Sequence, residues 1–401
     1  MTDAVFSSLM SLKNWIRENG YAGYDPYDIK GHPLILKLTG FGNKNYAAAL
    51  LREVVFELFY TFPVASRRIM HIKPACNAKA MGLFASSYLD LYSLQQDEKC
   101  LEQMHICLNW LKNNKIPGNH GFGWGYPFDW QSTVLIPSGT PNGIVTTTVG
   151  EAFWKHYRLF GDKESLTYCT EICKFLFRLP VDQLGKDQIC FSYTPLFLNH
   201  VHNLNLFVAE FLIKTGMETG NSGWIETGHN AVNYTLDKQS ETGAFDYNGP
   251  PEKPLKHYDN YHTGFVLRML HSIWILTGRE DVQAALHKGY QYYVAHFFEN
   301  DIPKLMPDRK YRIDIHSCSE SIHCLSALST IFPEGLKLAE NILAWTIENL
   351  QDKSGYFYYG ILKSRITGMP FKSKIPYIRW SQAWMLRAMS SYLVSASLKS
   401  V

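Results

Sequence analysis

The sequence predicts an all-α protein in which six helical hairpins close into a ring, or toroid. Charged, amphipathic helices alternate along the chain with helices that are more apolar and rich in small residues. The apolar helices start roughly sixty residues apart, a period that indicates a repeated pair of helices. A related turn of glycine and aromatic residues precedes several of them. Closure of the ring lets the apolar helices bury their faces against one another.

The chain begins with a predicted helix over about residues 6–18, which is followed by a turn-rich segment that contains Asp25 and Asp28. We expect residues 1–44 to form an N-terminal helix and an extended segment that pack on the ring. No Ser/Gly-rich or Pro-rich run of low complexity interrupts the chain, so a single domain over 1–401 is expected.

The ring itself is expected from two sets of helices. The outer, amphipathic helices are predicted over 45–62, 99–114, 164–178, 223–238, 281–299 and 334–351. The inner, apolar helices are predicted to begin near Cys76, Asn142, Asn199, Asp259, His316 and Pro376. The short Gly-aromatic loops are GFGWGYPFDW (121–130), CFSYT (190–194), GAFDY (243–247) and GYFYYG (355–360). Glycine permits the tight turn, and the aromatic rings provide a packing surface.

The composition excludes several classes of function. A net charge of +3, with Lys and Arg scattered over 401 residues, argues against a nucleic-acid-binding surface. The N-terminus lacks the basic start and apolar run of a signal peptide, and no segment has the ~18 uncharged apolar residues of a spanning helix. The eight cysteines lack the spacing of a secreted disulfide scaffold, so a cytoplasmic protein with reduced thiols is expected.

The most informative stretch covers residues 243–278 and reads GAFDYNGPPEKPLKHYDNYHTGFVLRMLHSIWILTG. It contains a Gly-aromatic turn, a proline-bearing loop and an apolar helix that Asp259 is expected to cap and Gly278 to stop. Polar residues therefore crowd the N-terminus of a helix whose remainder is apolar. This pattern is typical of a buried helix whose N-terminus borders a pocket.

From about residue 45 to 394 the pattern resembles the six-hairpin (α/α)6 toroid of glycosidase-like enzymes. The segments DNYHTGFVLRML and HVHNLNLFVAEFL resemble a family found in bacterial polysaccharide-biosynthesis clusters, whose members often carry the label of delta-aminolevulinic acid dehydratase. Nothing in the sequence supports that label, because no lysine stands in the strand of a βα-barrel. The toroid resemblance implies a carbohydrate-active enzyme, and this fold serves hydrolases, lyases and epimerases.

In such a toroid the pocket lies at the end where the inner helices begin, so polar residues at those positions are the candidates. The candidate catalytic residues are Asp259, His262, Glu320 and His202. The candidate substrate-binding residues are Asp129, Trp130, Asn203, Tyr247, Asn260, Tyr261, His316, Arg379 and Trp380. We expect one cavity to be lined by Asp129, His202, Asp259, His262, His316, Glu320 and Arg379. His257 is a further candidate in the fourth unit.

Each candidate also has a structural interpretation. Asp259 can act as a helix cap alone, and His262 can be a core histidine bonded to a backbone carbonyl. His202 and Asn203 can join neighbouring hairpins, Arg379 can pair with a carboxylate, and the tryptophans can belong to the core. Glu320 is the hardest to explain structurally, because a glutamate is rarely buried without a partner.

No metal or cofactor is expected. The segment HSCSESIHC (316–324) offers two histidines and two cysteines, but Cys318 points away from the face that the histidines share, and no C-x-x-C partner exists elsewhere. The string GFGWG (121–125) lacks the Lys-Ser/Thr ending of a phosphate-binding loop.

Aromatic and polar residues together favour an oligosaccharide or polysaccharide substrate. Hydrolysis, our first interpretation, needs one protonated and one ionised carboxyl, and Glu320 with Asp259 or Asp129 supplies them. The alternative is a polysaccharide lyase or a uronyl or sugar epimerase, in which a His or Tyr removes a proton. Its residues would come from His202, His262, Tyr261, Asn203, Asn260 and Arg379. A third interpretation is a non-catalytic, glycan-binding toroid.

Overall fold

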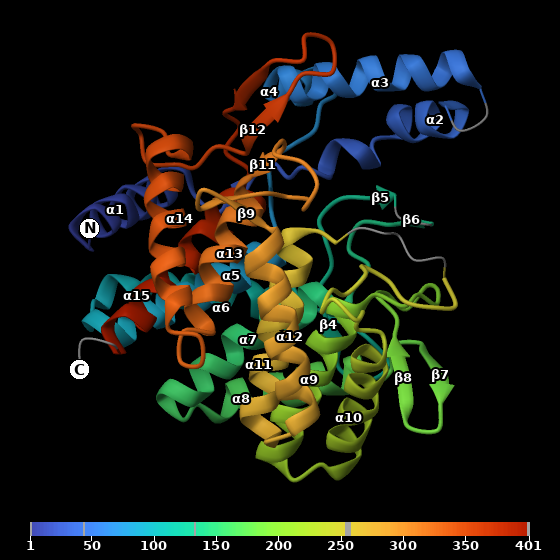
Figure 1. Ribbon diagram of the computed structural model, residues 1–401, viewed down its shortest axis with the longest axis vertical. Helices are drawn as coiled ribbons and strands as arrows, with labels where there is room; N and C mark the ends of the chain where they lie inside the picture. Colours follow the sequence, from blue (N-terminus) through green and yellow to red (C-terminus); the bar gives the residue numbers. More distant parts are fainter. Residues whose placement is uncertain (1, 43–44, 132–133, 253–257, 399–401) are drawn as a thin grey trace.

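The computed structural model of the protein describes residues 2–42, 45–131, 134–252 and 258–398 (Figure 1). Its inner helices are α5 (Ala78–Gln95), α7 (Gly143–Phe160), α9 (His202–Thr219), α11 (Asn260–Thr277), α13 (Ile315–Ala327) and α15 (Trp384–Leu398). A π-helical turn, Ile378–Ala383, leads into α15. Each inner helix packs against the next, and α15 packs against α5, so the inner helices form a closed ring. The predicted all-α toroid is confirmed.

The outer helices lie around this ring. They are α6 (Glu98–Asn113), α8 (Lys163–Leu176), α10 (Ser222–Asp237), α12 (Glu280–His296), α14 (Glu334–Leu350) and α1 (Thr2–Asn19). Helices α6, α8, α10, α12 and α14 each follow their inner partner in the chain, whereas α1 comes from the N-terminus and packs on α14 and α15.

One predicted outer helix does not belong to the ring. The helix expected over 45–62 exists as α3 (Tyr46–Thr61), but it packs against α2 (Pro33–Gly42) and α4 (Pro63–Ile69) in an arm that stands off from the toroid (Figure 1). Helix α1 takes the sixth outer position because Val5, Leu9, Leu12 and Ile16, spaced along one face, are each no more than 1% exposed.

Four of the inner helices, α5, α7, α11 and α13, are capped at their N-terminal ends by short polar side chains. Asn77, Asn142, Asp259 and Asp314 each accept a hydrogen bond from a backbone N–H of the first helical turn. Helices α7, α9 and α11 end at glycines in the left-handed conformation, which turns the chain towards the outer helix. Because these caps mark the starts of the inner helices, the residues beside them lie at the same end of the ring.

The strands are short and antiparallel. Two-stranded pairs are formed by β1 (Ala22–Gly23) with β2 (Ala75–Cys76), β3 (Ile116–Pro117) with β4 (Phe122–Gly123), β5 (Trp130–Gln131) with β6 (Leu135–Ile136), β7 (Val181–Gly185) with β8 (Gln188–Phe191), and β9 (Phe298–Glu299) with β10 (Ile302–Pro303). One sheet is larger than a pair. Strands β11 (Ile313–Asp314), β12 (Gly360–Lys363) and β13 (Pro370–Ser373) form a three-stranded sheet.

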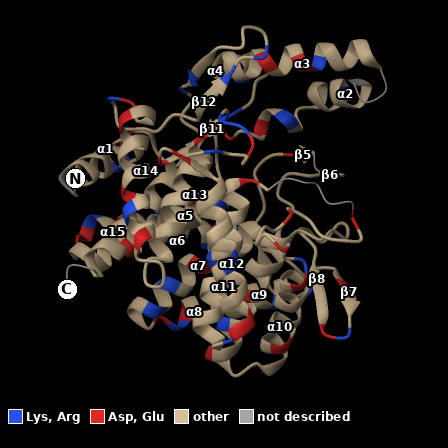
Figure 2. Ribbon diagram, in the orientation of Figure 1, with Lys and Arg blue, Asp and Glu red and all other residues tan. Residues whose placement is uncertain are grey.

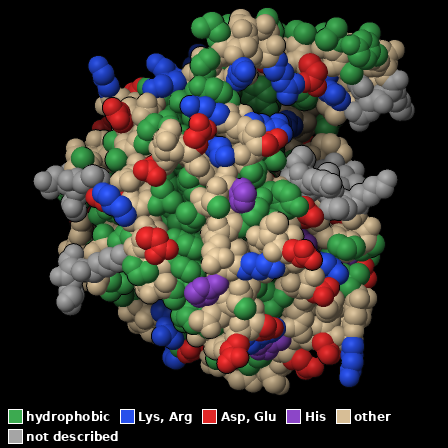
Figure 3. Space-filling view, viewed as in Figure 1, with side chains coloured by type: hydrophobic (Ala, Val, Ile, Leu, Met, Phe, Trp, Pro, Cys, Tyr) green, Lys and Arg blue, Asp and Glu red, His purple; other side chains and the backbone are tan. Residues whose placement is uncertain are grey.

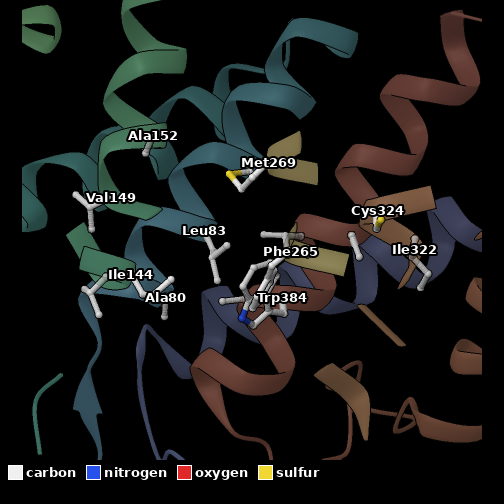
Figure 4. Packing of buried hydrophobic residues seen from close by; sticks show 14 of the residues in the cluster. Ala80, Leu83, Ile144, Val149, Ala152, Phe265, Met269, Ile322, Cys324 and Trp384 are labelled. Atoms are coloured by element: carbon white, nitrogen blue, oxygen red, sulfur yellow. The ribbon is translucent and has the colours of Figure 1, made fainter. Parts of the chain in front are cut away.

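The hydrophobic core fills the inside of the ring (Figure 4). Phe265 of α11 and Trp384 of α15 pack together in the core, with ring centroids 5.4 Å apart. This aromatic layer divides the interior into two ends, each of which contains a cavity. No helix of the described residues has both the length and the apolarity to cross a membrane.

Candidate active site

A cavity of about 180 Å³ opens where the inner helices begin. Most of its wall is aromatic: Tyr27, Tyr126, Phe128, Trp130, Tyr193, Tyr247, Tyr261, Phe265 and Trp380. The polar residues of the wall are Lys79, Gln131, Asn203, His262, His316 and Arg379. The caps and Gly-aromatic loops described above bring these residues together from both halves of the chain.

Asp259 and His262 form a hydrogen-bonded pair at the start of α11. One carboxylate oxygen of Asp259 caps the helix by accepting the His262 backbone N–H at 2.9 Å, and the other lies 2.6 Å from His262 Nδ1. The imidazole is 24% exposed and lies against the rings of Tyr247 and Tyr261, with centroids 4.6 and 4.4 Å away. Because Nδ1 is engaged by the carboxylate, Nε2 is the nitrogen left to accept a proton.

Asp25 and Arg379 form a buried ion pair beneath the cavity. Arg379 donates from Nε and Nη2 to the two oxygens of Asp25 at 2.6 and 2.7 Å, and both side chains are at most 4% exposed. The guanidinium lies 5.0 Å from the ring of Tyr126 and 5.1 Å from that of Trp380. A bidentate pair of this kind fixes the orientation of both side chains.

Lys79 is the least compensated charge in the cavity. It is 5% exposed, and its Nζ lies 5.5 Å from the ring of Phe265 and 5.3 Å from that of Trp384. No carboxylate of the described residues forms an ion pair with it. Burial and the nearby positive charge of Arg379 lower the pKa of Lys79 to about 7.

His316 lies beside Lys79 and is fully enclosed by aromatic rings. The ring centroids of Tyr261, Trp380 and Trp384 are 4.6, 4.4 and 4.8 Å from that of His316. Burial and the charge of Lys79 hold the pKa of His316 well below its usual value, so the imidazole is neutral. Its Nδ1 has no hydrogen-bond partner among the described residues.

The structure thus brings many of the predicted site residues to one cavity. They are Trp130, Asn203, Tyr247, Tyr261, His262, His316, Arg379 and Trp380. Asp259 reaches the cavity through its bond to His262. The chemical roles expected for these residues stay predictions. His257 lies outside the described residues.

Two expected catalytic residues do not line this cavity, and the prediction was wrong on their placement. Glu320 is completely buried on α13 and accepts two hydrogen bonds from Arg268 of α11, at 2.6 and 3.2 Å. His202 is 1% exposed and stacks on Tyr234 of the outer helix α10. Burial lowers the pKa of His202 to about 3, as expected for a neutral core histidine.

Two expected binding residues have structural positions as well. Asp129 accepts a hydrogen bond from the Ser138 backbone N–H at 2.6 Å and so fastens its own loop. Asn260 uses its side-chain oxygen to accept hydrogen bonds from Tyr293 and Ser321 inside the core. Neither side chain lines the cavity, because each is turned towards its partner in the surrounding scaffold.

Five residues of the wall were not among the predicted candidates: Lys79, Tyr27, Tyr126, Phe128 and Tyr193. A signal for Lys79 was present: it stands two residues after the cap Asn77, just as His316 stands two residues after Asp314. The cysteines of the predicted 316–324 segment are buried thiols, and the described residues contain no group of His, Cys, Asp and Glu that could hold a metal ion.

Comparisons with known proteins support the architecture. No family model matches the chain, and no curated protein does. Among solved structures, the cellobiose 2-epimerase of Bacillus thermoamylovorans is similar with a TM-score of 0.61 and 12% identity, over 80% of this chain and 88% of that one. A GH76 α-mannanase of Bacteroides thetaiotaomicron is similar with a TM-score of 0.63 and 11% identity, over 82% of this chain and 88% of that one. A polysaccharide lyase is similar with a TM-score of 0.58 and 12% identity, over 80% of this chain and 91% of that one. This chain has the (α/α)6 toroid fold.

The Asp25–Arg379 pair provides a test of how the cavity is held. In Asp25→Ala the guanidinium of Arg379 stays buried without its partner, so we expect the free energy of unfolding to fall by about 3–5 kcal/mol. Asp308→Ala is the matched control, because Asp308 pairs with Arg309 at the exposed surface and should change stability by about 0–1 kcal/mol. Urea unfolding of both variants measures the difference, and equal effects would contradict a structural role for the buried pair.

Lys79 provides a test based on pH. The pKa of Lys79 is lowered in the folded state, so the fold must bury a charged ammonium below about pH 7. Between that pH and the ordinary lysine pKa, only the unfolded chain keeps the proton, so stability rises with pH. Lys79→Met should therefore stabilise the protein most at pH 6, and the gain should shrink by about 1.4 kcal/mol per pH unit above pH 7. If urea unfolding shows the same gain at pH 6 and pH 9, the pKa of Lys79 is not lowered in the folded protein and this explanation is wrong.

Proposed function

We propose that the protein is a carbohydrate-active enzyme that removes a proton from the sugar carbon next to a carboxylate or carbonyl group. Elimination by a lyase and inversion by an epimerase both begin with this step. The observation that carries the proposal is the Asp259–His262 pair, whose imidazole faces a cavity that also contains Lys79. A cellobiose 2-epimerase and a polysaccharide lyase are among the structures with the same fold.

The wall of the cavity suits a sugar with a negative charge. Aromatic faces such as those of Tyr126, Trp130 and Tyr193 can cover the apolar faces of sugar rings. Arg379 already has Asp25 as a counter-ion, whereas Lys79 has none among the described carboxylates. A uronate carboxylate, or an oxygen that becomes negative during the reaction, would supply that missing counter-ion.

Each residue of the site has its own role in proton transfer. His262 Nε2 takes the proton from carbon, and the Asp259 carboxylate stabilises the imidazolium that results. The electron pair of the C–H bond moves onto the neighbouring carbonyl or carboxylate oxygen, which the Lys79 ammonium stabilises. In an elimination this electron pair then forms the C=C bond, the C–O bond of the next carbon breaks, and the departing glycosidic oxygen takes a proton from the His262 imidazolium or from water. Return of a proton to the opposite face, from Tyr261 or a water molecule, completes an epimerisation.

Hydrolysis has less support from the geometry. A glycosidase needs two carboxyl groups on either side of the scissile bond. No Asp or Glu belongs to the described wall of the cavity, and Glu320 and Asp129 are engaged elsewhere. We therefore rank elimination and epimerisation ahead of hydrolysis.

The biological setting is part of the proposal. The resemblance of the segments around His202 and His262 to a polysaccharide-biosynthesis family supports a bacterial glycan as substrate. All eight cysteines are free thiols, which supports a reducing compartment such as the cytoplasm.

The proposal is tested with uronate-containing oligosaccharides and three readouts. Elimination creates an unsaturated uronate that absorbs in the ultraviolet, and epimerisation in deuterated water exchanges a ring proton. Hydrolysis creates a reducing end with neither signal. We expect His262→Gln to lower kcat by ~10²–10⁴-fold without a change in Tm, because only the base is lost. His287→Gln, at an exposed position of α12, is the matched control. Reducing ends alone, or full activity in His262→Gln, would overturn the mechanism.

A further inference from the structure

The arm formed by α2, α3 and α4 exposes an unusual amount of apolar side chain. Every fourth residue of α3 and its C-cap is a large hydrophobic residue that faces solvent: Tyr46, Leu50, Val54, Leu58 and Phe62 are 87, 59, 44, 49 and 58% exposed. Consecutive residues at this spacing share a helix face, so the five form a continuous stripe that winds slowly around the helix. The solvent-facing side of a surface helix normally carries polar residues, so this stripe indicates a surface that a binding partner covers.

A second apolar element stands beside the stripe. The turn between β12 and β13 exposes Ile366 (75%) and Met369 (67%). It is fastened to α3, because the Arg365 backbone N–H donates to Glu57 at 3.0 Å and the Arg365 guanidinium pairs with Glu53. Figure 3 shows hydrophobic side chains over the arm with Lys and Arg side chains close by. The stripe and the turn together form what we call the arm surface.

A groove of about 320 Å³ with an apolar floor and a basic rim lies between α3, residues 305–312 and the β12–β13 hairpin. The floor consists of Tyr60, Leu305, Met306, Tyr311, Leu362 and Phe371, and the rim of Arg309, Arg312, Lys363 and Arg365. Glu57 is the one carboxylate of the described lining, and it accepts the Arg365 N–H. Asp308 pairs with Arg309, Asp314 with Arg312 and Glu53 with Arg365. The rim's positive charge without a carboxylate partner among the described residues therefore comes from Lys363 and from its exposed neighbours Lys310 and Lys372. Figure 2 shows Lys and Arg residues gathered near β12 and α4.

We propose that the arm surface docks the protein onto a lipid bilayer with anionic headgroups. The hydrophobic stripe enters the boundary between headgroups and acyl chains, and the basic rim binds headgroup phosphates. Apolar area and positive charge side by side are the two features that hold an interfacial helix on an anionic bilayer. No spanning segment is needed for binding of this kind.

The charge distribution favours a bilayer over a second copy of the chain. A two-fold dimer would place the same surface on both sides of the contact, so one basic rim would face another. Like charges brought together in this way oppose association. A bilayer with anionic headgroups offers the complementary charge and the apolar interior at once.

Docking of the arm would also orient the toroid. The arm stands at the end of the ring where β5, β11 and β12 lie (Figure 1). The helical turn that leads into the arm, η1 (Asp28–Gly31), packs on β5, which carries Trp130 of the cavity wall. The cavity would therefore lie on the bilayer side of the protein.

Co-flotation of the full chain with vesicles tests the proposal. The vesicles contain phosphatidylcholine alone or phosphatidylcholine with one third phosphatidylglycerol. We expect binding to the anionic vesicles only, and weaker binding at high salt. Leu50→Ser/Leu58→Ser and, separately, Arg309→Gln/Lys363→Gln should each lower the bound fraction about tenfold or more. Ile275→Ser/Met217→Ser is the matched control. Both residues are at least 50% exposed, and both belong to helices of the ring and not to the arm.

Folding is checked by circular dichroism and Tm, since the substituted side chains face solvent and should leave both unchanged. Equal binding of the control and the arm variants would overturn the proposal, as would absence of binding to anionic vesicles. Light scattering is measured on the same samples. A concentration-dependent dimer that only the arm variants disrupt, without vesicle binding, would assign the arm surface to a second copy and also overturn the proposal.

Discussion

The ion pair between Asp25 and Arg379 is the constraint on which the rest of the structure depends. It joins residues 354 positions apart, and it does so at the seam where the two ends of the chain meet. Backbone contacts reinforce it, because the Ile378 N–H donates to the Tyr24 carbonyl and Gly23 lies against Ile378. The seam ties the N-terminal segment to the π-helical turn that leads into α15, and it sets the floor of the cavity. The cavity above it therefore shares the stability of the ring.

The two ends of the toroid use buried charge differently. At the far end, a cavity of about 200 Å³ is lined by Glu210, Arg268, Arg387 and other polar residues. Their charges are matched within the protein, since Arg268 pairs with Glu320 and Glu210 with Lys214. At the near end, among the described residues, Lys79 has no such partner, and His262 is bonded to Asp259 through one ring nitrogen while the other has no partner. This contrast supports our proposal that proton transfer takes place at the near end.

The fold was largely predictable because local signals repeat. Caps such as Asn142 and Asp259, and stops such as Gly278, mark the inner helices without any knowledge of the tertiary structure. The sixth outer helix was misassigned because the pattern of residues 45–62 shows an amphipathic helix but not the neighbour it packs against. That choice depends on contacts between α1 and α15, which are distant in sequence.

The site was predictable only in part, because local signals mark the helix starts but side-chain directions depend on tertiary packing. The helix starts indicate which positions border the cavity, but not the direction of each side chain. Glu320 did need a partner, as its burial implied, but that partner was Arg268 on the adjacent helix and not a substrate. His202 sits at a helix start like His262, yet its ring turns towards Tyr234 of the outer helix. Such orientations follow from packing between hairpins.

A crystal structure with a bound uronate oligosaccharide tests the central claim most directly. We expect a sugar ring stacked on the aromatic wall, its carboxylate near Lys79 Nζ, and His262 Nε2 within about 3–3.5 Å of the carbon that loses its proton. A sugar bound in the cavity at the far end of the ring, or a glycosidic bond flanked by two carboxyl groups, would contradict it.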